Sequence, residues 1–242
     1  MPAVRPLACL DLDGTLVDSR GPFATSMRAA LAEEGLPDRA PTSLHRHLGP
    51  PLEETAALLV ADAVTDGLVP ADEAPARAEA LLHAYRRHYR RLGVPATTVV
   101  AGVPEALAAL AADGWRLVIV TAKIAPAAEA VLAATGLDAA VPTLYAPAPE
   151  ERHVPKARSL ARAIADHAAL AGPGAAVAMV GDRRHDVAAA VACGVPGIGV
   201  TWAGDHGDEL RAAGAAAILD RPADLPGALA ALRPPADPEP VA

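Results

Sequence analysis

The chain has 242 residues and a formal net charge of −8, and its aromatic residues are two Trp, three Tyr and one Phe. The negative charge opposes binding to a phosphate backbone, and the six aromatic side chains offer little surface for base stacking. We therefore expect no nucleic acid polymer as a partner. The apolar start is interrupted by Arg5 and Asp11, and no apolar run approaches the roughly 20 residues of a membrane span. We therefore expect a cytoplasmic protein with no membrane partner, and its two cysteines, Cys9 and Cys193, provide no disulfide framework.

The first predicted strand ends in two aspartates. The apolar residues 7–9 precede the sequence Leu-Asp-Leu-Asp-Gly-Thr, which places Asp11 and Asp13 at the end of the buried run. Residues two apart on an extended chain point to the same side, so both carboxylates face one way. Gly14 then allows a sharp turn. Because ligands of open α/β sheets bind beyond the carboxyl ends of the strands, this segment is typical of a reactive site.

Residues from about 20 to 94 are predicted to be almost entirely helical. In the clearest helix, from about residue 72 to 92, apolar side chains recur at helical spacing. They are Ala78, Leu81, Leu82, Tyr85, Tyr89 and Leu92. The opposite face carries four arginines, which we expect to be solvated: Arg86, Arg87, Arg90 and Arg91. The pattern predicts a separate helical module, to which we assign residues 19–95.

From about residue 97 onward, predicted helices and buried strands alternate. The strands cover 116–121, 141–145, 176–180 and 197–201, and the helices cover 104–112, 126–135, 156–170 and 186–193. Such repetition predicts an α/β fold with a Rossmann-like parallel sheet and helices on both faces. The α/β core is then discontinuous, with residues 1–18 and 96–233, and we expect the proline-rich tail 234–242 to be disordered.

Polar residues fall at one edge of this predicted sheet. Thr121 ends one strand, Asp182 follows another, and Lys156 begins a helix, while Asp186 lies one helical turn after Asp182. Since parallel strands end at the same edge, these side chains should surround one small volume with the two aspartates of the first strand. Four clustered carboxylates need a cation, and oxygen ligands without a cysteine or histidine set favour Mg²⁺.

Four ordered motifs carry a family resemblance. They are Asp-Leu-Asp-Gly-Thr at 11–15, Val-Ile-Val-Thr at 118–121, Lys156, and Val-Gly-Asp-Arg-Arg-His-Asp at 180–186. In order and spacing this set resembles the haloacid dehalogenase-like superfamily over about two-thirds of the chain. The helical module resembles the helical cap of that family, and segments 48–52, 85–86 and 101–104 are similar to its phosphoglycolate phosphatase-like branch. Ala157 follows the lysine where a common form has proline, which leaves the ammonium in place.

The resemblance implies a Mg²⁺-dependent phosphatase that hydrolyses a small phosphorylated metabolite, a phosphomonoester, through an aspartyl-phosphate intermediate. It implies that Asp11 is the nucleophile and that Asp13 is the general acid and base. The carboxylates of Asp11 and Asp182, with the backbone carbonyl of Asp13, would ligate Mg²⁺.

The resemblance also implies phosphate-binding and supporting residues. Gly14, Thr121 and Lys156 would bind the phosphoryl group. Thr15 would orient Asp13, Asp186 would hold the lysine or a metal-bound water, and Lys123 would face the substrate or the cap. The only two lysines of the chain, against nineteen arginines, are Lys123 and Lys156, which favours roles that need a compact ammonium group.

Several alternatives stay open. A phosphomutase or a nucleotidase of the same superfamily would use the same residues, whereas a dehalogenase would need neither Asp13 nor Asp182. A non-catalytic phospho-acceptor or phosphate-sensing domain, from a different class, would gather similar groups but has no residue like Asp13 to activate water. A phosphohistidine mechanism at residues 46–47 lacks the surrounding pattern, and we expect His185 on a helix surface.

The sequence does not identify the leaving group of the substrate. Phosphoglycolate, a sugar phosphate and a nucleoside monophosphate all stay possible, because selectivity lies in cap loops such as residues 46–52. The oligomeric state is not predicted either.

Overall fold

A parallel sheet forms the centre of the protein. The computed structural model describes residues 5–45, 47, 52–151, 154–171 and 175–233, and within them six strands pair in the order β5-β4-β1-β6-β7-β8. All five pairings are parallel, with β1 in the middle between β4 and β6. The strands are β1 (Leu7–Leu10), β4 (Arg116–Val120), β5 (Leu144–Tyr145), β6 (Val177–Gly181), β7 (Gly197–Val200) and β8 (Ala217–Leu219). The α/β fold class predicted from the sequence is confirmed.

Helices cover both faces of the sheet, because successive side chains of each strand point to opposite faces. Leu7 and Cys9 share an apolar cluster with residues of α9 (Lys156–Ala171) and α10 (Arg184–Ala192). Ala8 and Leu10 belong to a second cluster with residues of α6 and α12. The further helices of this part are α6 (Val103–Ala112), α7 (Ala125–Thr135), α8 (Leu137–Ala140), α11 (Gly207–Ala212), η3 (Pro222–Asp224) and α12 (Leu225–Ala230).

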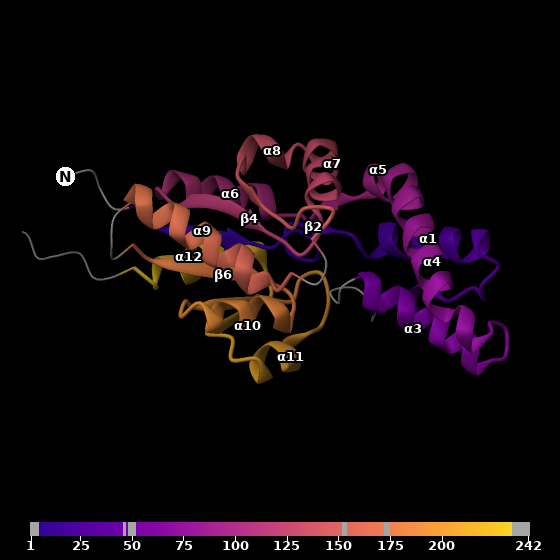
Figure 1. Cartoon of the computed structure of the whole chain (residues 1–242). Coiled ribbons are helices and arrows are strands. Elements are labelled where there is room, and N and C mark those ends of the chain that lie inside the picture. The colour runs from indigo at the N-terminus through magenta and orange to yellow at the C-terminus, as the bar shows by residue number, and fades with distance from the viewer. Residues whose placement is uncertain (1–4, 46, 48–51, 152–153, 172–174, 234–242) are drawn as a thin grey trace, which may run out of the picture.

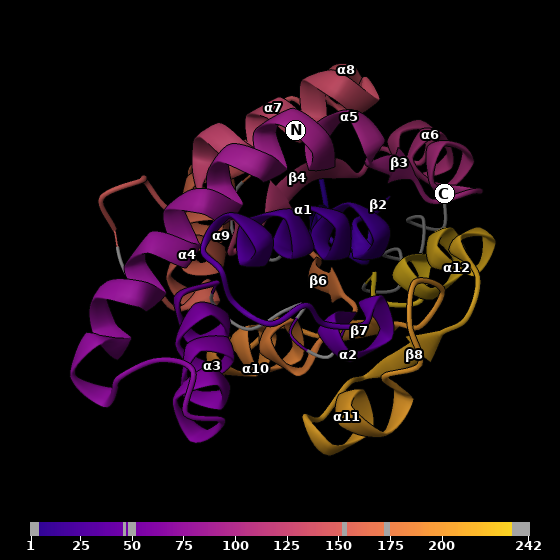
Figure 2. The ribbon, with the colours of Figure 1, turned by 90° about the vertical axis from the view of Figure 1, so that its right-hand side faces the viewer.

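The chain between β2 and β3 is helical and lies at one end of the α/β part (Figure 1), and Figure 2 looks onto it. Its elements are α1 (Arg20–Glu33), α2 (Pro41–His45), α3 (Leu52–Thr65), η1 (Ala71–Glu73), α4 (Ala74–His88), the π-helical turn η2 (Tyr89–Gly93) and α5 (Val94–Ala96). Leu81, Leu82, Tyr85 and Tyr89 are buried, as the apolar stripe predicts, and α4 with η2 matches the predicted long helix.

A short antiparallel pair joins the helical part to the sheet. The strands β2 (Val17–Asp18) and β3 (Thr98–Val99) pair where the chain leaves the α/β part and where it returns. Two-residue strands are too short to show an alternating pattern, so the sequence did not predict them.

Other elements differ from the sequence prediction. The strand expected at 141–145 is confined to β5, and β8, α8, α11 and α12 were not predicted. The expected tail 234–242 and most of the cap loop 46–52 lie outside the described residues. Among the described helices, none combines the length and the apolar character needed to cross a membrane, and the cytoplasmic location stays a prediction.

Candidate active site

The loop after β1 places Asp11 and Asp13 at the edge of the sheet. The backbone N–H of Asp11 donates to the carbonyl oxygen of Val180 on β6 at 2.9 Å, so this residue still follows the strand. Gly14 then has a φ of +78°, a left-handed conformation that favours glycine. A Cβ atom at Gly14 would lie 2.2 Å from Asp182 Oδ2, so this position needs glycine for space as well as for its backbone angle.

Three carboxylates meet beside this loop. Asp11, Asp182 and Asp186 each offer an oxygen atom, and the three atoms lie within 4.8 Å of one another. All three side chains are buried, and Asp182 Oδ1 has no hydrogen-bond partner within the described structure. A Cβ atom at Gly181 would lie 2.1 Å from Asp186 Cγ, so a second glycine makes room for the cluster. Buried carboxylates this close together require a compensating cation.

Burial raises the pKa of two carboxyl groups of the cluster, Asp11 and Asp182. Burial raises the pKa of Asp11 to about 6, although the charge of Lys156 opposes the rise. Burial also raises the pKa of Asp182 well above its ordinary value, and the charges of Asp186 and Asp11 add to that rise. A cation placed among these oxygens would restore their charged form.

Lys156 provides one compensating charge. It is the first residue of α9, and its Nζ lies 2.9 Å from Asp11 Oδ1 and donates a hydrogen bond to Asp186 Oδ1. Asp186 Oδ2 accepts a second bond from the backbone N–H of Arg183 at 3.0 Å. Burial opposes the charged ammonium, but the nearby carboxylates of Asp11 and Asp186 raise the pKa of Lys156. Lys156 is therefore a permanent cation beside Asp11.

Lys123 provides a second charge beside Asp13. Its Nζ lies 3.0 Å from Asp13 Oδ2 and donates to the hydroxyl of Tyr89 at 3.2 Å. The same Nζ lies 4.4 Å from the centre of the Tyr89 ring, within cation–π range, and Tyr89 stacks on Tyr85 with the ring centres 5.5 Å apart. Burial opposes the charge of Lys123, but Asp13 raises its pKa. Lys123 thus connects Asp13 to the helical part.

The remaining predicted residues lie around this centre. Thr121 is buried at the end of β4, and its Oγ1 accepts a hydrogen bond from the backbone N–H of Lys123 at 3.2 Å. Thr15 is also buried, but its Oγ1 has no hydrogen-bond partner in the described part of the chain, so the expected bond to Asp13 is absent. The backbone carbonyl of Thr15 instead accepts a hydrogen bond from Trp202 Nε1 at 2.9 Å, which fixes the loop that follows β1.

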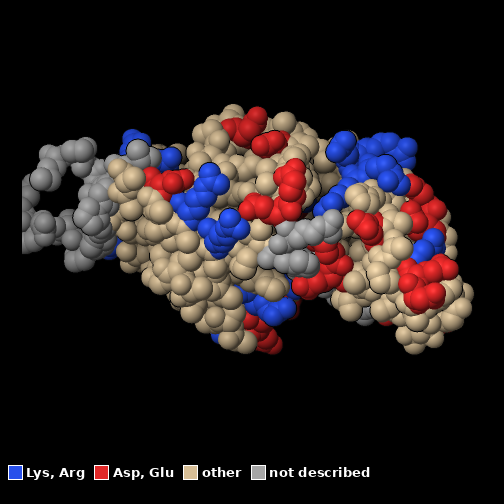
Figure 3. Space-filling model, viewed as in Figure 1, with Lys and Arg blue, Asp and Glu red and all other residues tan. Residues whose placement is uncertain are grey.

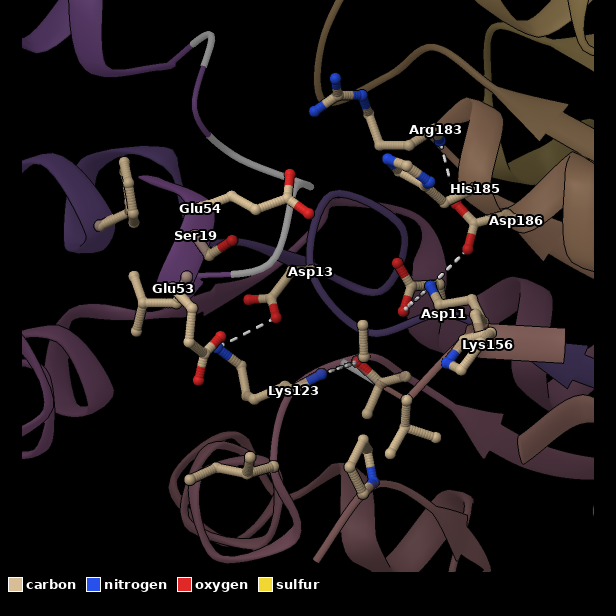
Figure 4. Close-up of a pocket in the computed structure, with 18 of the residues that line it drawn as sticks. Asp11, Asp13, Ser19, Glu53, Glu54, Lys123, Lys156, Arg183, His185 and Asp186 are labelled. Atoms are coloured by element: carbon tan, nitrogen blue, oxygen red, sulfur yellow. Dashed lines mark hydrogen bonds and ion pairs between the residues drawn. The ribbon is translucent and has the colours of Figure 1, made fainter. Parts of the chain in front are cut away.

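The site is a pocket of about 380 Å³ between the sheet edge and the helical part. Asp13 and the side chain of Lys123 lie on one side of it, and Asp11, Lys156 and Asp186 lie on the other (Figure 4). Gly14 and Thr15 do not line this pocket, and Gly14 lines a smaller neighbouring cavity of about 220 Å³. The predicted residues that do line it are Asp11, Asp13, Thr121, Lys123, Lys156, Asp182 and Asp186.

Some lining residues were not predicted to be there. Arg86, expected on a solvated face, is half-buried and its Nη2 lies 3.0 Å from Glu53 Oε1 of α3, because α3 packs against α4 at this point. His185, expected on a helix surface, is half-buried at the pocket, and burial lowers its pKa. Glu53 and Glu54 carry no local motif that connects them to the sheet edge, so only the packing of α3 reveals them.

Comparisons with known proteins agree with this geometry. Residues 9–200 match the family described as haloacid dehalogenase-like hydrolase. The chain is 31% identical to the probable phosphatase IndB of Dickeya dadantii over 95% of both chains. It is 34% identical to a 5'-nucleotidase of Pseudomonas aeruginosa, with 86% of this chain and 87% of the relative covered. It is also 34% identical to a phosphoglycolate phosphatase of Rhodospirillum rubrum, with 89% and 87% covered.

Solved structures share the fold. A crystal structure of a predicted phosphatase from Clostridium acetobutylicum superposes with a TM-score of 0.77 at 23% identity, and covers 95% of this chain and all of that one.

Proposed function

Because the chain belongs to the haloacid dehalogenase-like hydrolase family and is a phosphatase of that family, we propose that it hydrolyses a small phosphomonoester in a Mg²⁺-dependent reaction through an aspartyl-phosphate on Asp11. One observation carries the proposal: at the end of β1, the buried side chain of Asp11 lies close to Lys156 and to the carboxylates of Asp182 and Asp186. We also propose that residues 19–95 are a cap over a core of residues 1–18 and 96–233.

The residues at the sheet edge fit a hard divalent cation. The carboxylates of Asp11 and Asp182 and the backbone carbonyl of Asp13 would hold it, all with oxygen atoms. Two features support this fit: Asp182 Oδ1 has no partner among the described residues, and the three buried carboxylates share the single charge of Lys156. When bound, Mg²⁺ supplies positive charge against the phosphoryl oxygens.

The first chemical step belongs to Asp11. Its carboxylate attacks phosphorus, the bond to the leaving-group oxygen breaks, and an acyl phosphate forms. Lys156 and the hydroxyl of Thr121 bind the phosphoryl oxygens, and the buried ammonium stabilises the charge that develops on them. Asp186 positions Lys156 through their hydrogen bond.

The proton transfers belong to Asp13. It gives a proton to the leaving-group oxygen in the first step and takes one from water in the second, when the water attacks the acyl phosphate. Lys123 holds the Asp13 carboxylate at 3.0 Å and itself contacts Tyr89, so the position of the acid depends on the cap. This capacity to activate water favours a phosphatase over a phospho-acceptor domain, whose phosphate persists.

A nucleotidase is the second candidate, and the 5'-nucleotidase of Pseudomonas aeruginosa among the relatives favours it. A phosphomutase would differ only in returning the phosphoryl group to a sugar. The nucleotidase and the general phosphatase share every residue named above, so they differ only in the leaving group.

The proposal is tested with p-nitrophenyl phosphate and Mg²⁺. Asp11→Asn and Asp13→Asn should each lower kcat by on the order of 10² or more, whereas the exposed Asp66→Asn on the cap should not. Intact mass after acid quenching should show a phosphorylated Asp13→Asn enzyme and no phosphorylated Asp11→Asn enzyme. Full turnover by Asp11→Asn, or undiminished activity in EDTA, would contradict the proposal.

A further inference from the structure

We infer that the pocket selects phosphomonoesters whose leaving group carries no negative charge and offers hydroxyl or ammonium donors, and that it disfavours a carboxylate. This inference rests on the proposed phosphatase function and names the substrate class of the same site. It follows from the charges that line the pocket on the side of the cap.

The cations that line the described pocket are already paired with carboxylates. Besides the two lysines of the catalytic centre, they are the side chains of Arg86 and Arg183. Arg86 Nη2 lies 3.0 Å from Glu53 Oε1, and Arg183 Nε and Nη2 donate to the two carboxylate oxygens of Glu209 at 3.1 and 3.3 Å. Arg183 therefore binds both oxygens of one carboxylate, and each of the two guanidinium groups already has a carboxylate partner that offsets its charge.

Acidic side chains form the wall that faces the leaving group. Glu53 and Glu54 lie in the first turn of α3. Both carboxylates lie on the same side of the pocket as Asp13, the group that protonates the leaving oxygen (Figure 4). In Figure 3, Asp and Glu side chains gather where the α/β part meets the helical part. No cation pairs with Glu54 among the described residues, so the described part of this wall carries a net negative charge.

This distribution of charge acts on the two ends of the substrate differently. The phosphoryl end meets Lys156 and the carboxylates that would hold the metal, whereas the leaving group meets Glu53 and Glu54. A carboxylate on the leaving group would be repelled there and would lose hydration without gaining a partner. Hydroxyl and ammonium groups donate hydrogen bonds, and carboxylate oxygens accept them, so such leaving groups fit the wall.

The test uses three phosphomonoesters of equal length that differ in the charge of the leaving group. They are 2-phosphoglycolate, 2-hydroxyethyl phosphate and phosphoethanolamine, with a negative, a neutral and a positive terminal group. We expect kcat/KM for each of the last two to exceed that for 2-phosphoglycolate by at least about tenfold, mainly through KM.

Two variants then test the role of the wall. Glu53→Gln removes one carboxylate and frees Arg86, and Glu54→Gln removes the unpaired charge without breaking an ion pair that the structure shows. Each should raise the ratio of kcat/KM for 2-phosphoglycolate over 2-hydroxyethyl phosphate by about fivefold or more. Glu73→Gln is the matched control, because Glu73 lies on the cap outside the pocket, and it should leave the ratio unchanged.

The outcomes separate this inference from the proposed function. Absence of turnover with all three esters and with p-nitrophenyl phosphate would contradict the phosphatase mechanism itself. Turnover with 2-phosphoglycolate as the best of the three would overturn the inference and leave that mechanism intact. An unchanged ratio in Glu54→Gln, with thermal unfolding like that of the wild type, would likewise overturn it.

Discussion

Removing the charge of the proposed nucleophile should stabilise the metal-free protein. Burial raises the pKa of Asp11 from its ordinary 3.8 to about 6 in the folded state. The folded chain therefore binds this proton more tightly than the unfolded chain, and the stability that it contributes is complete below pH 3.8 and is lost as the pH rises through 6. Since a tenfold change in proton affinity is worth about 1.4 kcal/mol, the loss is on the order of 3 kcal/mol.

Asp11→Asn imitates the protonated carboxyl at every pH. In urea titrations with EDTA at pH 7.5, we expect this variant to be more stable than the wild type by on the order of 3 kcal/mol, since the pKa of about 6 already includes the attraction between Lys156 and Asp11. The difference should shrink towards zero as the pH falls to 4. Asp66→Asn, at an exposed position, should show no such trend.

Magnesium should reverse this order, because only the wild type keeps the full ligand set and binding stabilises the folded state. An Asp11→Asn variant that is less stable than the wild type at pH 7.5 in EDTA would refute the argument from burial. A difference that stays constant from pH 4 to 7.5 would refute it as well.

Three further substitutions test the centre. Lys156→Met leaves buried carboxylates without their cation, and it should lower the free energy of unfolding in EDTA by about 3–5 kcal/mol. Arg158→Met removes a cation from an exposed ion pair, and it should lower the free energy of unfolding by less than about 1 kcal/mol in the same denaturation assay. Gly14→Ala should lower kcat by on the order of 10² in a steady-state assay, because its Cβ displaces Asp182, and wild-type kcat would contradict the close approach. Lys123→Met should lower kcat by on the order of 10², and Tyr89→Phe, which keeps the ring, by about 2- to 10-fold; equal losses would contradict the larger role of the ammonium in positioning Asp13.

The sequence predicted the core well because its signals are local. Buried parallel strands appear as short apolar runs, and polar residues after them mark one edge of the sheet, so the sequence alone predicts that Asp11, Thr121 and Asp182 lie at that edge. Lys156 was placed because it begins a helix after a strand. The catalytic roles of these residues stay predictions.

The side of the pocket that the helical part forms could not be predicted in the same way. Arg86 and Glu53 are 33 positions apart, and only the packing of α3 on α4 brings them together. Helical periodicity identifies which face of a helix is apolar, but it does not show which polar residues at the edge of that face meet another element. For Thr15, the motif suggested that it orients Asp13, whereas its buried Oγ1 has no hydrogen-bond partner among the described residues.

The pairing of β2 with β3 also has an evolutionary consequence. Val17 and Val99 are partners across this pair, so the chain leaves the α/β part and comes back at neighbouring points. A segment with adjacent ends is exchangeable, because another segment of different length joins the same two points without disturbing the sheet. On the proposed division into a core and a cap, a chimaera joined between β2 and β3 would change the choice of leaving group and keep the chemistry of bond cleavage.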